Sequence, residues 1–95
     1  MKAGREYGEF VYEKLRRFYP DLVVTLDDKI RGNESGLVRQ IDVSIRGRVN
    51  GADLLYIVQC KDHGRPADMV RIGEFSAVIR DVGASKGYLI AQEAS

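Results

Sequence analysis

Asp42, Gln59 and Lys61 are the residues of this chain whose types and spacing are best suited to chemistry. Gln59 and Lys61 stand two apart at the end of an apolar run, 54–61, that is typical of a β-strand. Side chains alternate between the two faces of a strand, so these two share a face. A carboxylate and an amide oxygen are suitable ligands for Mg²⁺ or Mn²⁺, and an ammonium group stabilises charge developing on a phosphate. This combination indicates metal-dependent hydrolysis of a phosphodiester.

The turn between two predicted strands indicates that Asp42 and Gln59 meet. Asn50-Gly51 is a favoured sequence for the type I′ turn of a two-residue hairpin, and the register that it sets places Asp42 opposite Gln59. Opposed side chains share a face, with Cβ atoms about 5 Å apart. Alternation along the segment 39–45 predicts that Asp42 points away from the apolar residues of that segment. Gly47 leaves a register shifted by one residue open, because it allows a second turn or a bulge.

The strand that carries Gln59 also suggests a third metal ligand. The backbone carbonyl of Cys60 is expected to coordinate the cation beside the oxygens of Asp42 and Gln59. The Cys60 side chain is expected on the opposite face, as a small core residue. Lys61 is expected to act on the charge of the transition state first and in proton transfer second.

These motifs resemble those of the PD-(D/E)xK nuclease superfamily, and most closely its Mrr-like group of type IV restriction enzymes, in which Gln replaces the acidic residue of the last motif. The matching residues are Arg39-Gln40-Ile41-Asp42-Val43 and Val58-Gln59-Cys60-Lys61. The resemblance implies a restriction-endonuclease-like fold, Mg²⁺ or Mn²⁺ as cofactor and DNA as substrate. It also implies an acidic metal ligand from the first helix. Many members carry it just after an aromatic residue; here Gly8 follows Tyr7, and Glu9 is the nearest candidate.

Basic residues near the motifs are candidates for contacts with the phosphate backbone of DNA. The formal net charge is only +1, with 31% charged residues, so any affinity for DNA must come from local clustering. The residues expected to contact DNA are Arg31, Arg39, His63 and Arg65, and Lys29 and Arg71 also flank the predicted site.

Two amphipathic helices and four strands are predicted around the motifs. Apolar residues at three- and four-residue spacings predict a helix over 5–18 and a second over 67–81, which Gly83 ends. Their expected buried residues include Phe10, Phe18, Ile72 and Phe75, with Met69 or Val70 at the start of the second helix. The predicted strands cover 21–26 (extendable to 30), 39–45, 54–61 and 86–91, and the last is expected to be buried and parallel to a neighbour. The order α-β-β-β-α-β predicts an α/β fold, a mixed sheet flanked by helices on both faces.

Length and composition exclude several other classes of protein. Ninety-five residues with 44% hydrophobic content predict one small domain over 1–95, with further domains in a longer protein left open. The single cysteine excludes an internal disulfide, and no Cys/His cluster has zinc spacing. The sequence has no apolar signal segment and no run of the ~20 apolar residues needed to span a bilayer. A cytoplasmic protein with no membrane partner is expected.

Two alternatives to a metal-dependent endonuclease remain at this stage. The first is a module of the same fold that has lost catalysis and binds only DNA or a partner protein. Gly8 and the neutral Gln59 favour it. The second is an enzyme similar to Holliday-junction resolvases, which shares the site and acts as a homodimer on branched DNA. Cleavage of plasmid DNA separates the first from an active nuclease, and preference for four-way junctions identifies the second.

Overall fold

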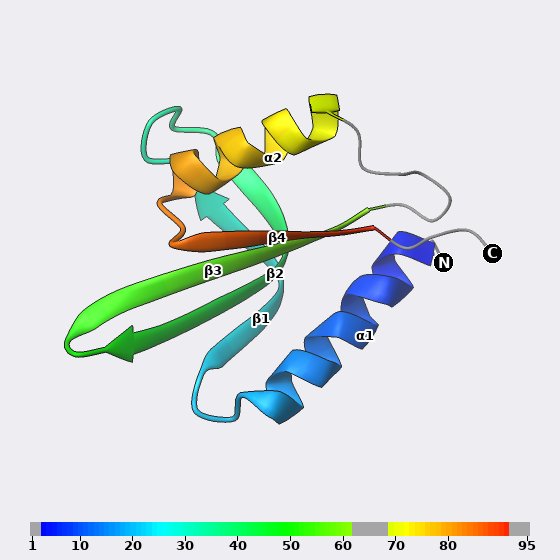
Figure 1. The fold of residues 1–95 in the computed structure, drawn as a ribbon, viewed down its shortest axis with the longest axis vertical. Helices are drawn as coiled ribbons and strands as arrows, with labels where there is room; N and C mark the ends of the chain where they lie inside the picture. Colours follow the sequence, from blue (N-terminus) through cyan, green and yellow to red (C-terminus); the bar gives the residue numbers. More distant parts are fainter. Residues whose placement is uncertain (1–2, 62–68, 92–95) are drawn as a thin grey trace.

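The computed structural model describes residues 3–61 and 69–91, with the side chains of 7–60 and 69–90. The predicted element order, α-β-β-β-α-β, is confirmed (Figure 1). The elements are α1 (Ala3–Phe18), β1 (Val23–Arg31), β2 (Val38–Val49), β3 (Ala52–Lys61), α2 (Met69–Val82) and β4 (Lys86–Ala91).

The four strands form one mixed sheet in the order β1-β2-β3-β4. The β1–β2 and β2–β3 pairs are antiparallel, whereas β3 and β4 are parallel, as predicted from the helix that connects them. Asn50 and Gly51 have φ values of 53° and 81°, the left-handed backbone that a type I′ turn requires. The predicted hairpin register is confirmed, because Val43 faces Val58 and Gly47 pairs without a shift.

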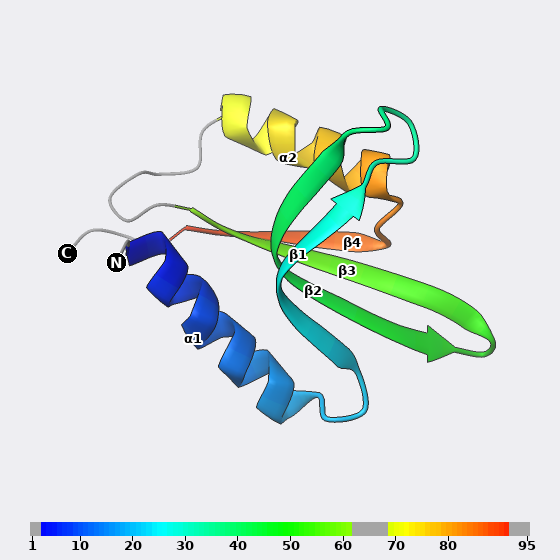
Figure 2. The ribbon, with the colours of Figure 1, turned by 180° about the vertical axis from the view of Figure 1, so that it is seen from behind.

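The sheet separates two apolar clusters. One helix lies on each side of the sheet, α1 on one side and α2 on the other (Figure 2). Neighbouring residues of β3 point to opposite faces: Ile57 belongs to the cluster under α2, and Val58 to the cluster under α1. Phe75 of α2 is buried in the first cluster, and Leu15 of α1 packs, partly buried, against the second. Helices therefore lie on both faces of the sheet. Neither helix, within the part of the chain that is described, is long and apolar enough to cross a membrane.

Several residues predicted to be buried are exposed. Phe18 at the end of α1 is 74% exposed and Met69 at the start of α2 is 82% exposed; Phe10, Val70 and Ile72 are also exposed. Each helix buries the residues that lie over the sheet, and the periodicity of its apolar residues continues beyond that contact. The prediction of a buried fourth strand is also wrong, because β4 is an edge strand of half-buried and exposed side chains.

Candidate functional site

The sheet divides at Asp42 and Gln59, a point that we call the fork. The β2–β3 ladder ends at the pair Val43 and Val58, so the next pair in the same register is Asp42 and Gln59. Beyond the fork, β2 stays paired with β1, whereas β3 continues beside β4 through Lys61. The two halves of the sheet diverge from there (Figure 1). Beyond this point, side chains rather than backbone groups of the opposite strand form hydrogen bonds with the backbone N–H and C=O groups of β2 and β3.

Asp42 and Gln59 supply those hydrogen bonds to each other's strands. The backbone N–H of Asp42 donates to Oε1 of Gln59 (2.9 Å), and Nε2 of Gln59 donates to the carbonyl of Gln40 (3.2 Å). In return, the backbone N–H of Cys60 donates to Oδ2 of Asp42 (2.7 Å). The structure therefore brings together Asp42 and Gln59 as the sequence predicted.

The alternation predicted for the segment 39–45 is wrong at Asp42. Ile41 packs in the cluster under α2, but Val43 packs in the cluster under α1. The β1–β2 ladder is interrupted at the same place, because Leu26 pairs with Val43 and the next pair is that of Asp28 with Ile41. Asp27, the residue skipped on β1, has φ of 59°, a left-handed conformation that is uncommon outside glycine. Both strands thus change face here, which a simple period of two does not describe.

A small pocket of about 200 Å³ opens beside the fork. Asp42, Gln59 and Cys60 line it from the sheet, and α2 contributes Arg71 and Glu74. Sequence analysis placed Arg71 only near the site and missed Glu74. Arg71 and Glu74 are three residues apart and so share a face of α2, as they do with Phe75 and Val78, which complete the pocket with Leu89. The three-residue spacing from Arg71 was the sequence signal that could have pointed to Glu74.

Cys60 lies as predicted, with its side chain partly buried against the cluster under α1. Burial, and then the nearby Asp42 carboxylate, raise the pKa of the Cys60 thiol to about 11. The thiol is therefore protonated at neutral pH and is a poor metal ligand or nucleophile. Only its backbone carbonyl remains a candidate ligand.

The donors around the pocket suit a hard cation. Asp42 and Glu74 offer carboxylate oxygens and Gln59 offers an amide oxygen, the ligand types that Mg²⁺ and Mn²⁺ prefer. Among the described residues, no group of three or more His, Cys, Asp or Glu side chains is placed to hold a metal ion.

The other predicted site residues are less closely gathered. Glu9 is half-buried on α1 and is not among the described residues that line the pocket. Lys61 continues β3 two residues beyond Gln59, and its side chain lies outside the described part of the chain. His63 and Arg65, predicted to contact DNA, also fall outside the described residues.

Arg31 and Arg39 flank the loop 32–37, which a buried carboxylate on α2 anchors. Asp81 accepts hydrogen bonds from the Ser35 hydroxyl (2.6 Å), from the backbone N–H groups of Ser35 (2.9 Å) and Glu34 (3.0 Å), and from Nε of Arg39 (2.8 Å). Arg31 donates instead to a carbonyl in the same loop. Arg39 is therefore a structural ion-pair partner as well as a candidate for DNA contact.

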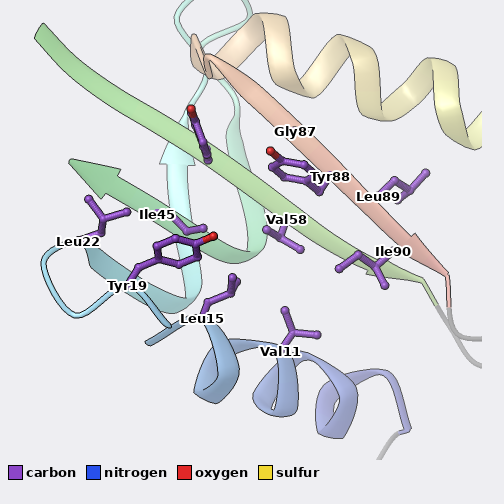
Figure 3. Close-up of a pocket in the computed structure, with 11 residues that line it drawn as sticks. Val11, Leu15, Tyr19, Leu22, Ile45, Val58, Gly87, Tyr88, Leu89 and Ile90 are labelled. Atoms are coloured by element: carbon purple, nitrogen blue, oxygen red, sulfur yellow. The ribbon is translucent and has the colours of Figure 1, made fainter. Parts of the chain in front are cut away.

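A larger and mainly apolar pocket, of about 630 Å³, lies between α1 and the sheet. Val11 and Leu15 of α1 point toward Val58 and Ile90 there (Figure 3). Its lining carries no carboxylate, amide or basic side chain among the described residues. The smaller pocket, in contrast, is lined by the charged and amide side chains of Asp42, Gln59, Arg71 and Glu74.

The fold is similar to that of a solved protein, whereas the sequence matches no protein-family profile and no curated protein. The crystal structure of AF1548, a protein of unknown function, superposes with a TM-score of 0.70 and 17% sequence identity. The alignment covers 96% of this chain and 48% of that one, so this chain spans about half of its length. At that identity the similarity establishes a shared α/β fold and nothing about activity.

Proposed function

We propose that this chain is a metal-dependent DNA endonuclease domain of the restriction-endonuclease-like class, most similar to the Mrr-like enzymes. The observation that carries the proposal is the fork, where Asp42 and Gln59 are interlocked at a pocket that also receives Arg71 and Glu74. Carboxylate, amide and guanidinium groups converge there on a space large enough for a phosphate group and water.

Each group has a role that follows from its chemistry. Asp42, Gln59 and the carbonyl of Cys60 would hold Mg²⁺ or Mn²⁺, with Glu74 as a second carboxylate in the pocket. Such a cation, when bound, supplies Lewis acidity and a more acidic water. Arg71 would orient the phosphate through its planar donors.

Lys61 and the basic residues outside the pocket would serve the substrate's charge. Lys61 would stabilise negative charge that develops during cleavage, since it follows Gln59 by two residues on β3. Arg31, Arg39, His63 and Arg65 would contact phosphates along the DNA rather than bases. Such contacts fix the position of the protein on the duplex and carry no sequence information.

Cleavage of supercoiled plasmid by the purified protein tests the proposal. We expect nicking and linearisation with Mg²⁺ or Mn²⁺ that excess EDTA abolishes, because the site offers too little charge without a cation. Asp42→Asn should abolish it too, since the amide keeps the shape but loses the charge. Asp53→Asn is the matched control, because the Asp53 side chain is 85% exposed on β3; it should cleave at the parental rate.

Other outcomes of the same assay decide between the alternatives. Cleavage that persists in EDTA contradicts the metal mechanism. DNA binding without cleavage under any metal condition favours a module that has lost catalysis. A dimer in solution that cleaves four-way junctions far faster than linear DNA favours the resolvase-like enzyme.

A further inference from the structure

We infer that Gln59 is a positioning residue: its side-chain amide replaces a backbone rung at the fork and so holds Asp42 in place. The inference deepens the proposed function, and only its catalytic part rests on that function. It assigns Gln59 a role that differs from that of a simple oxygen ligand for a cation.

The hydrogen bonds of Gln59 reproduce those of a strand residue. In a parallel pair, a residue accepts at its own C=O from the N–H of the residue after the one that it faces, and donates its own N–H to the carbonyl of the residue before that one. The amide of Gln59 accepts from the N–H of Asp42 (2.9 Å) and donates to the carbonyl of Gln40 (3.2 Å). The side chain therefore occupies the place of a parallel strand beside Ile41, where β3 itself has turned away.

The bond that Asp42 returns to β3 makes the arrangement reciprocal. Oδ2 of Asp42 accepts from the N–H of Cys60 at 2.7 Å, so each side chain closes onto the opposite strand. Gln40 extends the network to β1, since its Nε2 donates to Asp27 (2.7 Å), the residue with the left-handed backbone. The orientation of the Asp42 carboxylate is thus fixed through the two strands that Gln59 joins.

This role requires an amide and excludes a carboxylate. An amide has one acceptor oxygen and two N–H donors, whereas an ionised carboxylate only accepts. Glutamate at position 59 would keep the bond from the N–H of Asp42 but would turn a negative oxygen toward the carbonyl of Gln40, beside the carboxylate of Asp42. A residue needed only as a cation ligand would be served at least as well by glutamate. The two roles therefore predict opposite effects of one substitution.

The test compares Gln59→Glu and Gln59→Met with Ala77→Glu, which adds the same charge at an exposed position of α2. At pH 7.5 we expect both Gln59 variants to melt about 5 °C or more below the control, because hydrogen bonds of the half-buried Gln59 amide are lost. By NMR, the amide protons of Asp42 and Cys60 should exchange about tenfold faster than in the parent. Gln59→Met reports the loss of both hydrogen bonds without the added charge.

Plasmid cleavage supplies the readout that a purely structural role would not move. At a temperature where all variants are folded, kcat of Gln59→Glu should fall at least about tenfold with KM for DNA unchanged, since Asp42 is misplaced. Parental melting, exchange and cleavage in Gln59→Glu would overturn the inference and leave Gln59 as a cation ligand only. Lower melting with parental kcat would overturn its positioning of Asp42. If the parent does not cleave, the proposed function fails. Melting and exchange still decide whether the Gln59 amide replaces backbone hydrogen bonds between the strands.

Discussion

Asp42 and Asp81 are two carboxylates that both accept backbone N–H groups, yet they lie in different surroundings. Asp81 is 3% exposed and accepts four hydrogen bonds, including the ion pair with Arg39. Asp42 is half-buried and lines a pocket with Gln59 and Glu74. A carboxylate enclosed by donors stabilises the fold, whereas one that faces a polar pocket is suited to bind a ligand.

The loop 32–37 shows what the enclosed carboxylate achieves. Asp81 joins the end of α2 to a connection between β1 and β2 that has no regular structure of its own. Gly32 lies so close to the Asp81 carboxylate that any side chain there would collide with it. The stability of this half of the sheet therefore depends on Asp81, and chemistry should depend on Asp42.

The largest expected difference between the two regions concerns Lys61, which we propose acts with Asp42. Lys61→Met keeps much of the side chain but removes the ammonium group, whose proposed effect appears only in the transition state. We expect plasmid cleavage to slow by roughly a hundredfold or more, with DNA affinity retained within several-fold. Gel-shift and cleavage assays on the same preparation measure both quantities. Cleavage at the parental rate would remove Lys61 from the site.

Asp81→Asn should mainly affect stability. The new amide would place donors against Nε of Arg39 and the Ser35 hydroxyl, both of which already donate. Loss of a buried pair of this kind should lower Tm by about 10 °C or more. Asp53→Asn, at an exposed pair with Arg48, should change Tm by about 2 °C or less. Equal shifts would mean that burial does not distinguish these carboxylates.

Lowering the pH should also destabilise the region around Asp81. Hydrogen bonds from the Ser35 hydroxyl and amide, and then from Arg39, hold the pKa of Asp81 well below its usual range. A carboxyl whose pKa is lower when folded stabilises the protein above its unfolded pKa of about 4, and this stabilisation is lost as the pH falls toward the folded value. The Tm, measured between about pH 6 and pH 2, should therefore decrease more steeply with falling pH for the parent than for Asp81→Asn. Parallel curves would contradict the assignment.

The smallest expected effects concern the basic residues. Arg65→Ala should weaken DNA binding several-fold for all sequences alike and reduce the salt dependence by about 0.9 in logarithmic slope, the contribution of one phosphate contact. Arg39→Ala should lower Tm as well, because it also breaks the ion pair with Asp81. Binding titrations at several salt concentrations measure the affinity and the salt dependence of both variants, and thermal melting measures the Tm of Arg39→Ala. A loss confined to one DNA sequence would indicate that Arg65 reads bases.

Much of the fold was predictable because local signals agree with it. Asn50-Gly51 set the hairpin register and so the meeting of Asp42 with Gln59, and the helix before β4 set the parallel pair. The crossing of β1 and β2 from one face to the other was not predictable, because it arises from packing against two different helices. Asp27 marks that crossing, yet nothing in its sequence context requires a positive φ.

The residues of the site that the sequence did not reveal come from α2. Glu74 resembles any exposed helix residue until the helix is placed over the fork. Asp81 did leave a signal, since a carboxylate in the last turn of a helix opposes the helix dipole and needs compensating donors. These signals show that the two residues are unusual or share a face of α2, but long-range packing decides what they contact.

A titration with Mn²⁺ followed by NMR tests most directly whether the cation site lies at Asp42 and not elsewhere. The paramagnetic ion should broaden the amide signals of Asp42, Gln59 and Cys60 first and leave those of Glu34 and Ser35, beside Asp81, sharp. Asp42→Asn should abolish the selective broadening. Broadening centred on the Asp81 loop, or broadening that Asp42→Asn leaves unchanged, would contradict a metal-dependent site at the fork.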